Sequence, residues 1–282
     1  MNRVEEIYSI LYKDYKYVDS YMDRVMQCKD TDYIPKVENA GEVIMKDEFK
    51  CQVMHNGVLI HEGCYHQAWV TDIIKALKGH HEPQEEKLFY EVLNIVPKGG
   101  VMVECGSFWS YYSLWFHKEI EEAKNIMIEP MPLKCELGKL NFELNNFDGE
   151  FINGYIGNQY NENSTFLDWD GARYDIPSVT IDHLFDKYYL EKIDVLHADI
   201  QNNEMTLLNG SINALTNKKI DYLFLGTHSY NAPIVDRLES LGYHIVESFE
   251  VWETYFDDGL ILACSPNVLD KVDKNKFKVS KK

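Results

Sequence analysis

Two carboxylates and one glycine, each near the end of an apolar run, are the residues best suited to ligand binding in this sequence. Glu104 lies two residues before Gly106 in the run VMVECGSFWSYYSLWF, and Glu129 ends the next run, NIMIE. In an open α/β sheet, ligands bind at the carboxyl ends of the strands. There, Gly106 would allow close backbone approach, Glu104 would suit a cationic group, and Glu129 could accept the hydroxyls of a ribose.

The turn after Glu104 contains one glycine, which bears on the choice of nucleoside. A dinucleotide site needs a G-x-G-x-x-G turn so that the backbone can pack against a pyrophosphate, and this disfavours NAD. S-adenosylmethionine carries an ammonium and a sulfonium but no phosphate, so it fits the turn better. Two other functions stay open: an NAD-type oxidoreductase on a similar sheet, and a non-catalytic protein that keeps the cofactor fold. Glu104 as a helix N-terminal partner and Glu129 as a surface turn residue are the structural alternatives.

Polar residues on later apolar runs suit acid–base chemistry. In VLHADI, His197 and Asp199 alternate to the same side of the expected strand, and His228 follows the run YLFLG. A base helps when an alcohol is methylated, because its proton must leave. Histidine titrates near neutrality, so we expect His228 to act as base and Asp199 to orient it or to bind the acceptor hydroxyl. His197, deeper in the strand, is a third candidate.

A divalent metal ion could bridge Asp199 to two acceptor hydroxyls. Oxygen-rich magnesium sites usually have more carboxylates than this segment offers. The metal therefore stays an open alternative, and no metal ligand is predicted.

The elements that must position these residues follow from the pattern of apolar runs. Strand-like runs alternate with helix-length segments and lie at 101–105, 125–129, 150–156, 195–200, 222–226, 244–249 and 260–265. This alternation is typical of an α/β fold with a mostly parallel sheet covered on both faces. The last two runs are expected to form an antiparallel hairpin around Asp257-Asp258-Gly259.

The flanking segments divide the chain into three parts. Residues 1–80 are expected to form a helical and hairpin extension, with a tight turn at Asn56-Gly57 and a helix over 67–77 capped by Gly79. Residues 81–265 form the main domain, which opens with a helix that has a proline near its start. Residues 266–282 form a lysine-rich tail that we expect to be frayed.

One polar segment, 158–177, interrupts the alternation and suits a functional or disordered loop. Its Trp169 and Tyr174 would suit a sugar, because aromatic rings stack on sugar C–H faces. Further polar contacts could come from His61, His66, His80 and His81. Packing or a solvated loop is the alternative for all of them.

The composition of the chain limits its partners and its compartment. The formal net charge is −18 and the pI is near 4.9, which argues against a nucleic-acid partner. No segment is apolar for long enough to span a membrane or to serve as a signal peptide. The six cysteines are scattered without C-x-x-C pairs, so a reduced, cytoplasmic protein with buried thiols is expected. The tyrosine-rich N-terminal segment is compatible with a homodimer.

Several motifs together resemble the FkbM-type S-adenosylmethionine-dependent methyltransferases. The stretch VECGSFWSYYSL resembles the family's V-D-x-G-A-N-x-G-x-x-S/T opening, and IEPMP followed by KLNFELNN resembles its E-P-x-P…L…N…N segment. Three later segments, SVTIDHL, IDVLHADIQNNE and LFLGTHS, resemble further family motifs in the right order. The resemblance runs from about His81 to Ser265.

The resemblance implies a class I methyltransferase fold, Rossmann-like, and methyl transfer to a hydroxyl oxygen of a small-molecule or glycan acceptor, often a sugar. It also assigns cofactor contacts by motif position: the methionine end at Glu104, Gly106, Ser107 and Ser110, the ribose at Glu129 with Pro130, and the adenine side at Asn145, Ile156 and Gly157. Asp199 would face the reacting centre.

The sequence departs from the family pattern at several positions. Ser110 replaces the second glycine, His197 a lysine, Gln201-Asn202 a Glu-Gly pair, and Gly226 a glutamate. The His-Ala-Asp-Ile-Gln form resembles a variant within the family. Gly226 puts a carboxylate-dependent role at its position in doubt.

Overall fold

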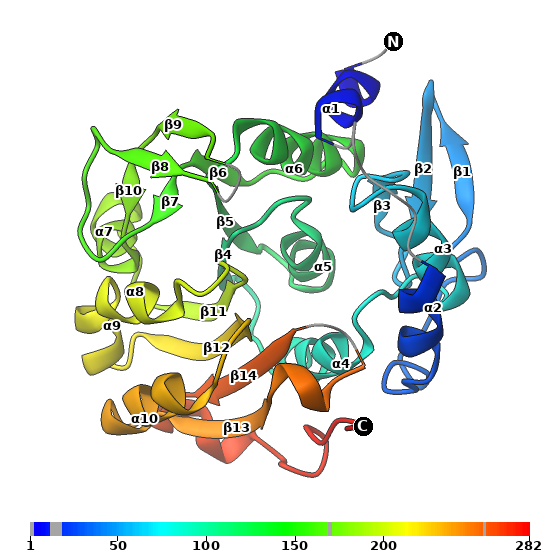
Figure 1. Cartoon of the computed structure of the whole chain (residues 1–282). Helices are drawn as coiled ribbons and strands as arrows, with labels where there is room; N and C mark the ends of the chain where they lie inside the picture. The colour runs from blue at the N-terminus through cyan, green and yellow to red at the C-terminus, as the bar shows by residue number, and fades with distance from the viewer. Residues whose placement is uncertain (1–2, 12–18, 169–170, 256–257) are drawn as a thin grey trace.

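A seven-stranded sheet organises the chain in the computed structural model (Figure 1), which describes residues 3–11, 19–168, 171–255 and 258–282. The strand order is β13-β14-β12-β11-β4-β5-β6, and each pair is parallel except the two that involve β14. The bounds are β4 (Val101–Cys105), β5 (Lys124–Glu129), β6 (Glu150–Asn153), β11 (Ile193–Ala198), β12 (Ile220–Thr227), β13 (His244–Phe249) and β14 (Gly259–Cys264). The sequence prediction of a mostly parallel sheet with a final antiparallel hairpin is confirmed.

One expected strand is divided in the structure. The run 150–156 was predicted as a single strand, but only β6 joins the main sheet. After Gly154 the chain continues as β7 (Tyr155–Ile156), which pairs in parallel with β10 (Ser178–Val179). The Gly154 N–H donates to the carbonyl oxygen of Glu129, at the carboxyl end of β5 (3.2 Å), so the chain leaves β6 close to that strand end.

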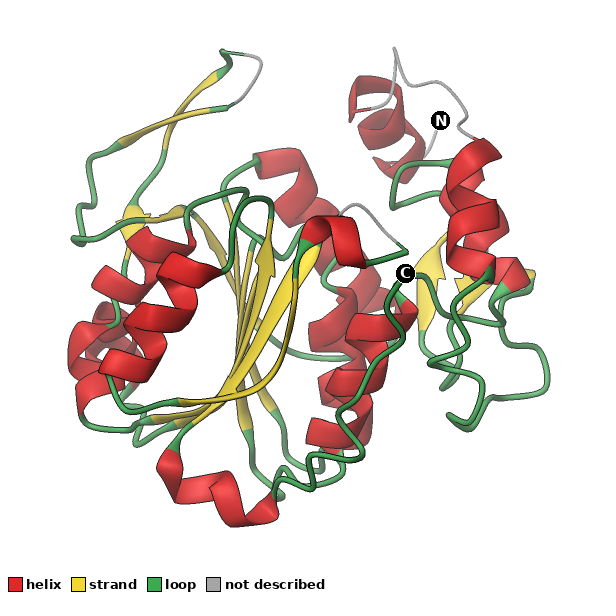
Figure 2. Cartoon of the chain, turned by 60° about the horizontal axis from the view of Figure 1, so that its bottom comes forward, coloured by secondary structure: helices red, strands yellow, loops and turns green. Residues whose placement is uncertain are grey.

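Helices cover both faces of the sheet, as Figure 2 shows. On one face the apolar side chains of α4 (Pro83–Leu93), α5 (Tyr111–Glu119) and α6 (Pro132–Leu144) form one core cluster. On the other face lie α7 (Ile181–Tyr188), α8 (Glu204–Asn209), α9 (Ile212–Thr216) and α10 (Ala232–Ser240). In α4, the buried residues Leu88, Phe89 and Val92 recur at helical spacing, and Pro83 occupies the first turn as predicted.

The strand register places polar residues next to one another. Glu104 of β4 is aligned with His197 of β11, and in a parallel pair aligned side chains point to the same face. Just beyond the strand ends, the Asp199 N–H donates to the Cys105 carbonyl oxygen (3.1 Å). Residues about 90 positions apart in the sequence therefore meet at one edge of the sheet.

The N-terminal extension packs beside α6 (Figure 1). It contains α1 (Arg3–Leu11), α2 (Asp19–Met26), β1 (Val43–Lys46), β2 (Phe49–Val53), β3 (Leu59–His61) and α3 (Ala68–Ala76). The hairpin at Asn56-Gly57 is confirmed, with β2 antiparallel to β3. The additional strand β1, which the sequence analysis missed, pairs with β2.

The C-terminal tail is ordered, so the expectation that it frays is wrong. It starts with the 3-10 helix η2 (Pro266–Lys271), and Phe277 is only 2% exposed. The Ser280 N–H donates to Asp30 in the N-terminal extension, and the Gln84 amide of α4 donates to the Ser280 carbonyl oxygen. Phe277 joins the core cluster, and its apolar burial holds the lysine-rich segment against the domain.

The polar segment 158–177 contains a hairpin that extends from the body of the domain (Figure 2). Its strands are β8 (Thr165–Leu167) and β9 (Arg173–Asp175), which are antiparallel. A short 3-10 helix, η1 (Val251–Glu253), follows β13. Among the described residues, no helix combines the length and the apolar character needed to cross a bilayer.

Candidate functional site

A cavity of about 960 Å³ opens at the carboxyl ends of β4, β5 and β11. Most residues singled out from the sequence line it: Glu104, Gly106, Ser107, Glu129, Pro130, Ile156, Gly157, His197 and Asp199. Ser110, Asn145 and His228 do not line it. The parallel sheet thus brings together strand ends from the whole domain in one cavity.

The turn after β4 passes very close to the end of β11, as a glycine at this position predicts. Gly106 has φ of +74°, and a Cβ atom on it would lie 1.9 Å from the carbonyl oxygen of Asp199. Any other residue would therefore push the β4 and β11 ends apart. The next residue, Ser107, is buried and lines the cavity, and its hydroxyl has no hydrogen-bond partner among the described residues. A buried hydroxyl without a partner suits a polar ligand group.

Ser110 serves the backbone and does not line the cavity. It has φ of 59°, so it keeps the left-handed conformation in which the family has a glycine. It is fully buried, and its hydroxyl packs so near Gly138 of α6 that a Cβ on Gly138 would lie 2.4 Å from it. The serine that replaces the family's glycine at position 110 is thus accommodated because Gly138, on the neighbouring helix, has no side chain.

Glu104 is a buried carboxylate at the floor of the cavity. Its Oε2 accepts a hydrogen bond from the backbone N–H of Ser113 in α5 (3.1 Å), so the alternative of a helix N-terminal partner also holds. Burial raises the pKa of Glu104 to about 7, although the nearby His197 and the Ser113 bond oppose the shift. A cation placed beside this carboxylate would favour its ionised form.

Glu129 is fixed by two backbone hydrogen bonds. Oε2 accepts from the N–H of Phe108 (3.0 Å), and Oε1 accepts from the N–H of Met131 (2.9 Å). Burial raises its pKa, and Lys134 opposes this shift. Each carboxylate oxygen has further lone pairs, so Glu129 can still accept hydroxyl groups from the cavity.

Asn145 lies away from the cavity. Its side chain accepts from the Leu59 N–H (2.9 Å) and donates to the Leu59 carbonyl oxygen (2.7 Å). This places it against β3 of the N-terminal extension, where it completes the hydrogen bonding of a strand edge. The structure does not bring it to the adenine side that the motif implied.

A second group of charges lies where β11 and β12 end and β14 begins. His228 Nε2 lies 3.0 Å from Asp258 and 3.6 Å from Asp199, and the Gln201 amide contacts both His228 and Asp199. Burial alone would lower the pKa of His228, but the bond to Asp258 and the charge of Asp199 outweigh it and raise it to about 9. Loss of hydration, with the nearby Asp258, raises the pKa of Asp199 to about 7.

These shifts reverse the reason for expecting His228 to be the base. A histidine with a pKa near 9 is an imidazolium at neutral pH and has no lone pair with which to take a proton. Asp199, which lines the cavity and titrates near neutrality, is better placed for that step. The missed signal was Asp258, whose position next to His228 depends on the antiparallel pairing of β12 with β14.

His197 is held by a carboxylate that the sequence analysis missed. Its Nε2 lies 2.8 Å from Glu85 at the start of α4, and its ring lies over Tyr112, with centroids 4.3 Å apart. Burial opposes protonation of His197, but Glu85 and Glu104 outweigh it and raise its pKa. The pair therefore favours the protonated form of His197 on β11, where the family usually has lysine.

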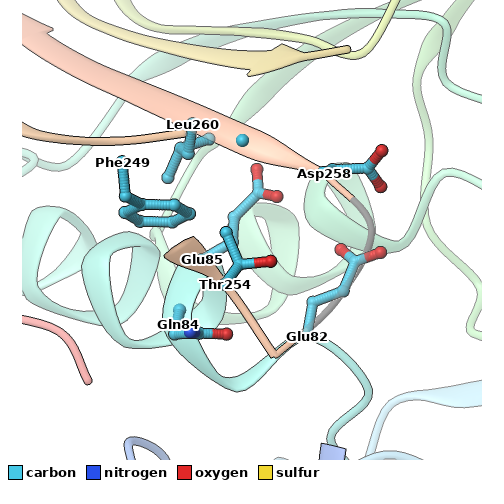
Figure 3. A pocket seen from close by; sticks show the side chains of 8 residues that line it. Glu82, Gln84, Glu85, Phe249, Thr254, Asp258 and Leu260 are labelled. Atoms are coloured by element: carbon cyan, nitrogen blue, oxygen red, sulfur yellow. The ribbon is translucent and has the colours of Figure 1, made fainter. Parts of the chain in front are cut away.

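Glu82, just before α4, is the other missed residue. Its Oε2 accepts from the Tyr112 hydroxyl (3.0 Å) and lies 3.2 Å from His81 Nε2. It lines the large cavity and also a small one of about 30 Å³ that adjoins Glu85 and Asp258 (Figure 3). Its only sequence signal was the run of acidic residues near a helix start, which the helix dipole explains equally well.

Aromatic residues form another wall of the cavity. Tyr65 of the extension stacks on Trp109 (4.8 Å, 11° between planes), which stacks on Tyr111 (5.0 Å, 14°). Phe108 meets the Tyr65 ring edge-on at 5.5 Å. No pattern in the sequence indicated that Tyr65 would reach this turn.

The other polar residues suggested from the sequence divide into two groups. His66 and His81 line the cavity, whereas His61 and His80 are buried elsewhere, His80 against Glu86. The hairpin β8–β9 contributes Phe166 and Asp168 to the lining, and Tyr174 lies next to Phe166. Trp169 falls outside the described residues.

No arrangement typical of a metal centre is present among residues 3–11, 19–168, 171–255 and 258–282: they contain no group of three or more His, Cys, Asp or Glu side chains that could hold an ion. All six cysteines are buried and unbridged, as expected.

Comparison with models of known protein families identifies one family. A family model described as the methyltransferase FkbM domain matches residues 93–245. No curated protein matches the sequence significantly. Similar solved structures include M. capricolum TrmK in complex with S-adenosyl-homocysteine (11% identity, 63% of this chain and 67% of that chain covered, TM-score 0.43). Another is a precorrin-6y C5,15-methyltransferase from Geobacter metallireducens (11% identity, 64% and 86% covered, TM-score 0.41).

Proposed function

This chain belongs to the FkbM methyltransferase domain family, and we propose that it methylates a hydroxyl oxygen of a sugar, a glycan or a sugar-bearing metabolite. Its sheet, with β14 inserted antiparallel between β13 and β12, is that of a class I methyltransferase, and its cofactor is S-adenosylmethionine. The proposal concerns the acceptor and the residues that act on it.

The cavity residues fit the cofactor. Gly106 provides the close backbone approach, and the unpartnered Ser107 hydroxyl and the buried Glu104 carboxylate suit the carboxylate and ammonium of the methionine end. Glu129, already oriented by two backbone donors, suits the ribose hydroxyls. Pro130 would lie beside the ribose, and Ile156 and Gly157 would lie beyond it, on the adenine side.

One observation carries the proposal of an alcohol acceptor: Asp199 reaches the cavity at the end of β11 with an imidazolium, His228, beside it. The bound cofactor supplies an electrophilic methyl group on its sulfonium. Asp199 would hold the acceptor hydroxyl in line and take its proton, since its pKa lies near the working pH. His228, fixed by Asp258, would stabilise the ionised Asp199 and keep it oriented.

The lining favours a neutral, hydroxyl-rich acceptor. Carboxylates and histidines at the reacting end are largely paired with one another, as in Glu82 with His81 and Glu85 with His197. Such pairs offer both donors and acceptors to hydroxyl groups without a large net charge. The nearby rings of Tyr65, Phe108 and Trp109 suit the C–H face of a sugar.

The first test is isothermal titration of the purified protein with S-adenosylhomocysteine and, separately, with NAD. We expect micromolar binding of the homocysteine compound, strong weakening by Glu129→Ala, and no binding of NAD. Equal binding in the variant would contradict the assigned ribose contact. Binding of NAD instead would favour the oxidoreductase alternative.

The second test measures methyl transfer from radiolabelled S-adenosylmethionine to a panel of methyl pyranosides and oligosaccharides. Label in an alkali-stable ether on a sugar oxygen is the expected result. Transfer to an amine or a carboxylate, with none to any hydroxyl compound, would overturn the proposed acceptor class while leaving the methyltransferase assignment in place.

A further inference from the structure

Part of the cavity wall comes from outside the matched family domain. Of the described residues that line the cavity, Tyr65, His66, His81 and Glu82 precede residue 93, where the family match begins. The cofactor contacts assigned above all lie inside the matched segment. A wall built from residues outside the matched segment is therefore suited to the ligand that differs among family members, the acceptor.

Tyr65 is held in a fixed orientation. Its ring stacks on Trp109, which stacks on Tyr111, and the rings of His66 and His81 meet it edge-on at 4.4 Å and 5.6 Å. The side chain is half-buried and lines the cavity. A ring that is fixed in this way at a cavity wall can pack against the C–H groups of a sugar at little cost in side-chain entropy.

The loop that carries Tyr65 has an unusual backbone. The two residues after it, His66 and Gln67, both have positive φ, 52° and 62°. Consecutive non-glycine residues in this region are rare and costly, and such strain occurs preferentially at functional sites. This conformation turns the chain from β3 into α3. The residues with the strained backbone therefore lie in the same loop as the residues that line the cavity.

Glu82 lies at the reacting end of the same wall. Among the described residues, its contacts to Tyr112 and His81 both use Oε2, so Oε1 keeps its lone pairs for a ligand hydroxyl. Its charge is felt at Asp199, where it contributes to the raised pKa. Glu82 therefore lies near the residue proposed to take the acceptor proton, away from the ribose-binding Glu129.

We propose that this wall, which precedes residue 93, forms the acceptor subsite, in which the Tyr65 ring packs on a pyranose face and Glu82 accepts hydroxyl groups of the same sugar. The inference rests on the proposed function, since it names the part of the chain that selects the sugar. Tyr65 and Glu82 then determine acceptor affinity and contribute little to cofactor affinity.

The test measures binding of methyl pyranosides to the protein loaded with S-adenosylhomocysteine, by saturation-transfer difference NMR. The pyranosides are the methyl glycosides of glucose, mannose, galactose, rhamnose and fucose. We expect Tyr65→Ala and Glu82→Gln each to lower the affinity for the glycoside by about tenfold. Tyr65→Phe should change this affinity by less than about twofold. Tyr189→Ala, which alters a tyrosine that is 92% exposed, is the matched control and should have no effect.

Titration of each variant with S-adenosylhomocysteine checks folding and separates the outcomes. Unchanged cofactor affinity with weakened glycoside binding supports the subsite. If Tyr65→Ala weakens cofactor affinity and leaves glycoside binding unchanged, the proposed acceptor subsite is wrong, and the wall instead covers the cofactor. If the wild-type protein binds the cofactor but neither binds nor methylates any glycoside, the proposed acceptor class fails, and the sugar subsite fails with it.

Discussion

The two ends of the cavity are built in different ways. At the proposed cofactor end, the turn after β4 and the strand end at Glu129 line the cavity, and backbone N–H groups orient the carboxylates. At the acceptor end, side chains from the extension, α4, β11, β12 and β14 meet, and they are held by ion pairs between side chains. The first is local in sequence, and the second is assembled from distant segments.

This difference has a functional consequence. A site whose geometry is fixed by backbone turns tolerates few substitutions, which suits a cofactor that is common to a family. A site made of paired side chains on several elements can change one partner at a time, which suits an acceptor that varies. We therefore expect backbone changes at the cofactor end to lower both stability and cofactor affinity strongly. Side-chain changes at the acceptor end should alter acceptor binding or catalysis and leave cofactor affinity nearly unchanged.

The largest effect is expected from Gly106→Ala. The new Cβ would meet the Asp199 carbonyl oxygen, and the positive φ adds strain, so we expect a loss of about 2 to 5 kcal/mol of stability and no measurable cofactor binding. Urea unfolding and S-adenosylhomocysteine titration measure both. Gly99→Ala is the matched control, since Gly99 also has positive φ but has nothing within 4 Å of the added atom. Equal losses in the two variants would mean that strain alone, and not the close approach, accounts for Gly106.

Asp199→Asn should separate catalysis from cofactor binding. Because the amide cannot take a proton, we expect kcat to fall by about 10²- to 10⁴-fold while the affinity for S-adenosylhomocysteine changes less than about threefold. Single-turnover methyl transfer and titration measure the two quantities. If His228→Gln lowers kcat as much and removes the acidic limb of the pH profile while Asp199→Asn does not, the roles within the pair are the opposite of those proposed.

Cofactor affinity should depend on pH through Glu104. Its pKa of about 7 means that the ionised fraction falls from about nine-tenths at pH 8 to one-tenth at pH 6. The neutral acid cannot pair with an ammonium group, so affinity for S-adenosylhomocysteine should fall by about tenfold over this range, and binding at pH 7 should release about half a proton per site. Titrations in buffers of different ionisation enthalpy measure the release.

The control for this pH dependence is Glu104→Gln, which should bind weakly with little dependence on pH. Asp199 has a raised pKa as well, so a dependence that persists in Glu104→Gln and disappears in Asp199→Asn would assign it to the acceptor end.

The smallest effect is expected from Ser110→Gly, which restores the family's glycine. Glycine relieves the left-handed strain and removes a buried hydroxyl without a partner, whereas its greater freedom in the unfolded chain opposes the gain. Stability should therefore change by no more than about 1 kcal/mol and cofactor affinity by less than twofold. A large loss of affinity, measured by the same titration, would show that the serine side chain itself contacts the cofactor.

Local patterns in the sequence were enough to predict the sheet and to place Glu104, Gly106 and Glu129 at its strand ends. The apolar runs, Pro83 at a helix start and Asn56-Gly57 in a hairpin each report on neighbouring residues, and the structure agrees with them. The predictions failed where an outcome depended on packing. The tail is ordered because Phe277 packs into the core, and the Asn145 side chain forms hydrogen bonds with the backbone of β3 in the extension.

The sequence by itself determined the α/β fold, the family and the positions of Glu104, Gly106 and Glu129, because strand, turn and helix signals act over a few residues. Only the tertiary structure decided the acceptor end. The pairing of β14 with β12 puts Asp258 beside His228, and the packing of α4 puts Glu85 on His197. The protonation states of these groups depend on burial and on charges from distant segments, and no short-range pattern in the sequence encodes either.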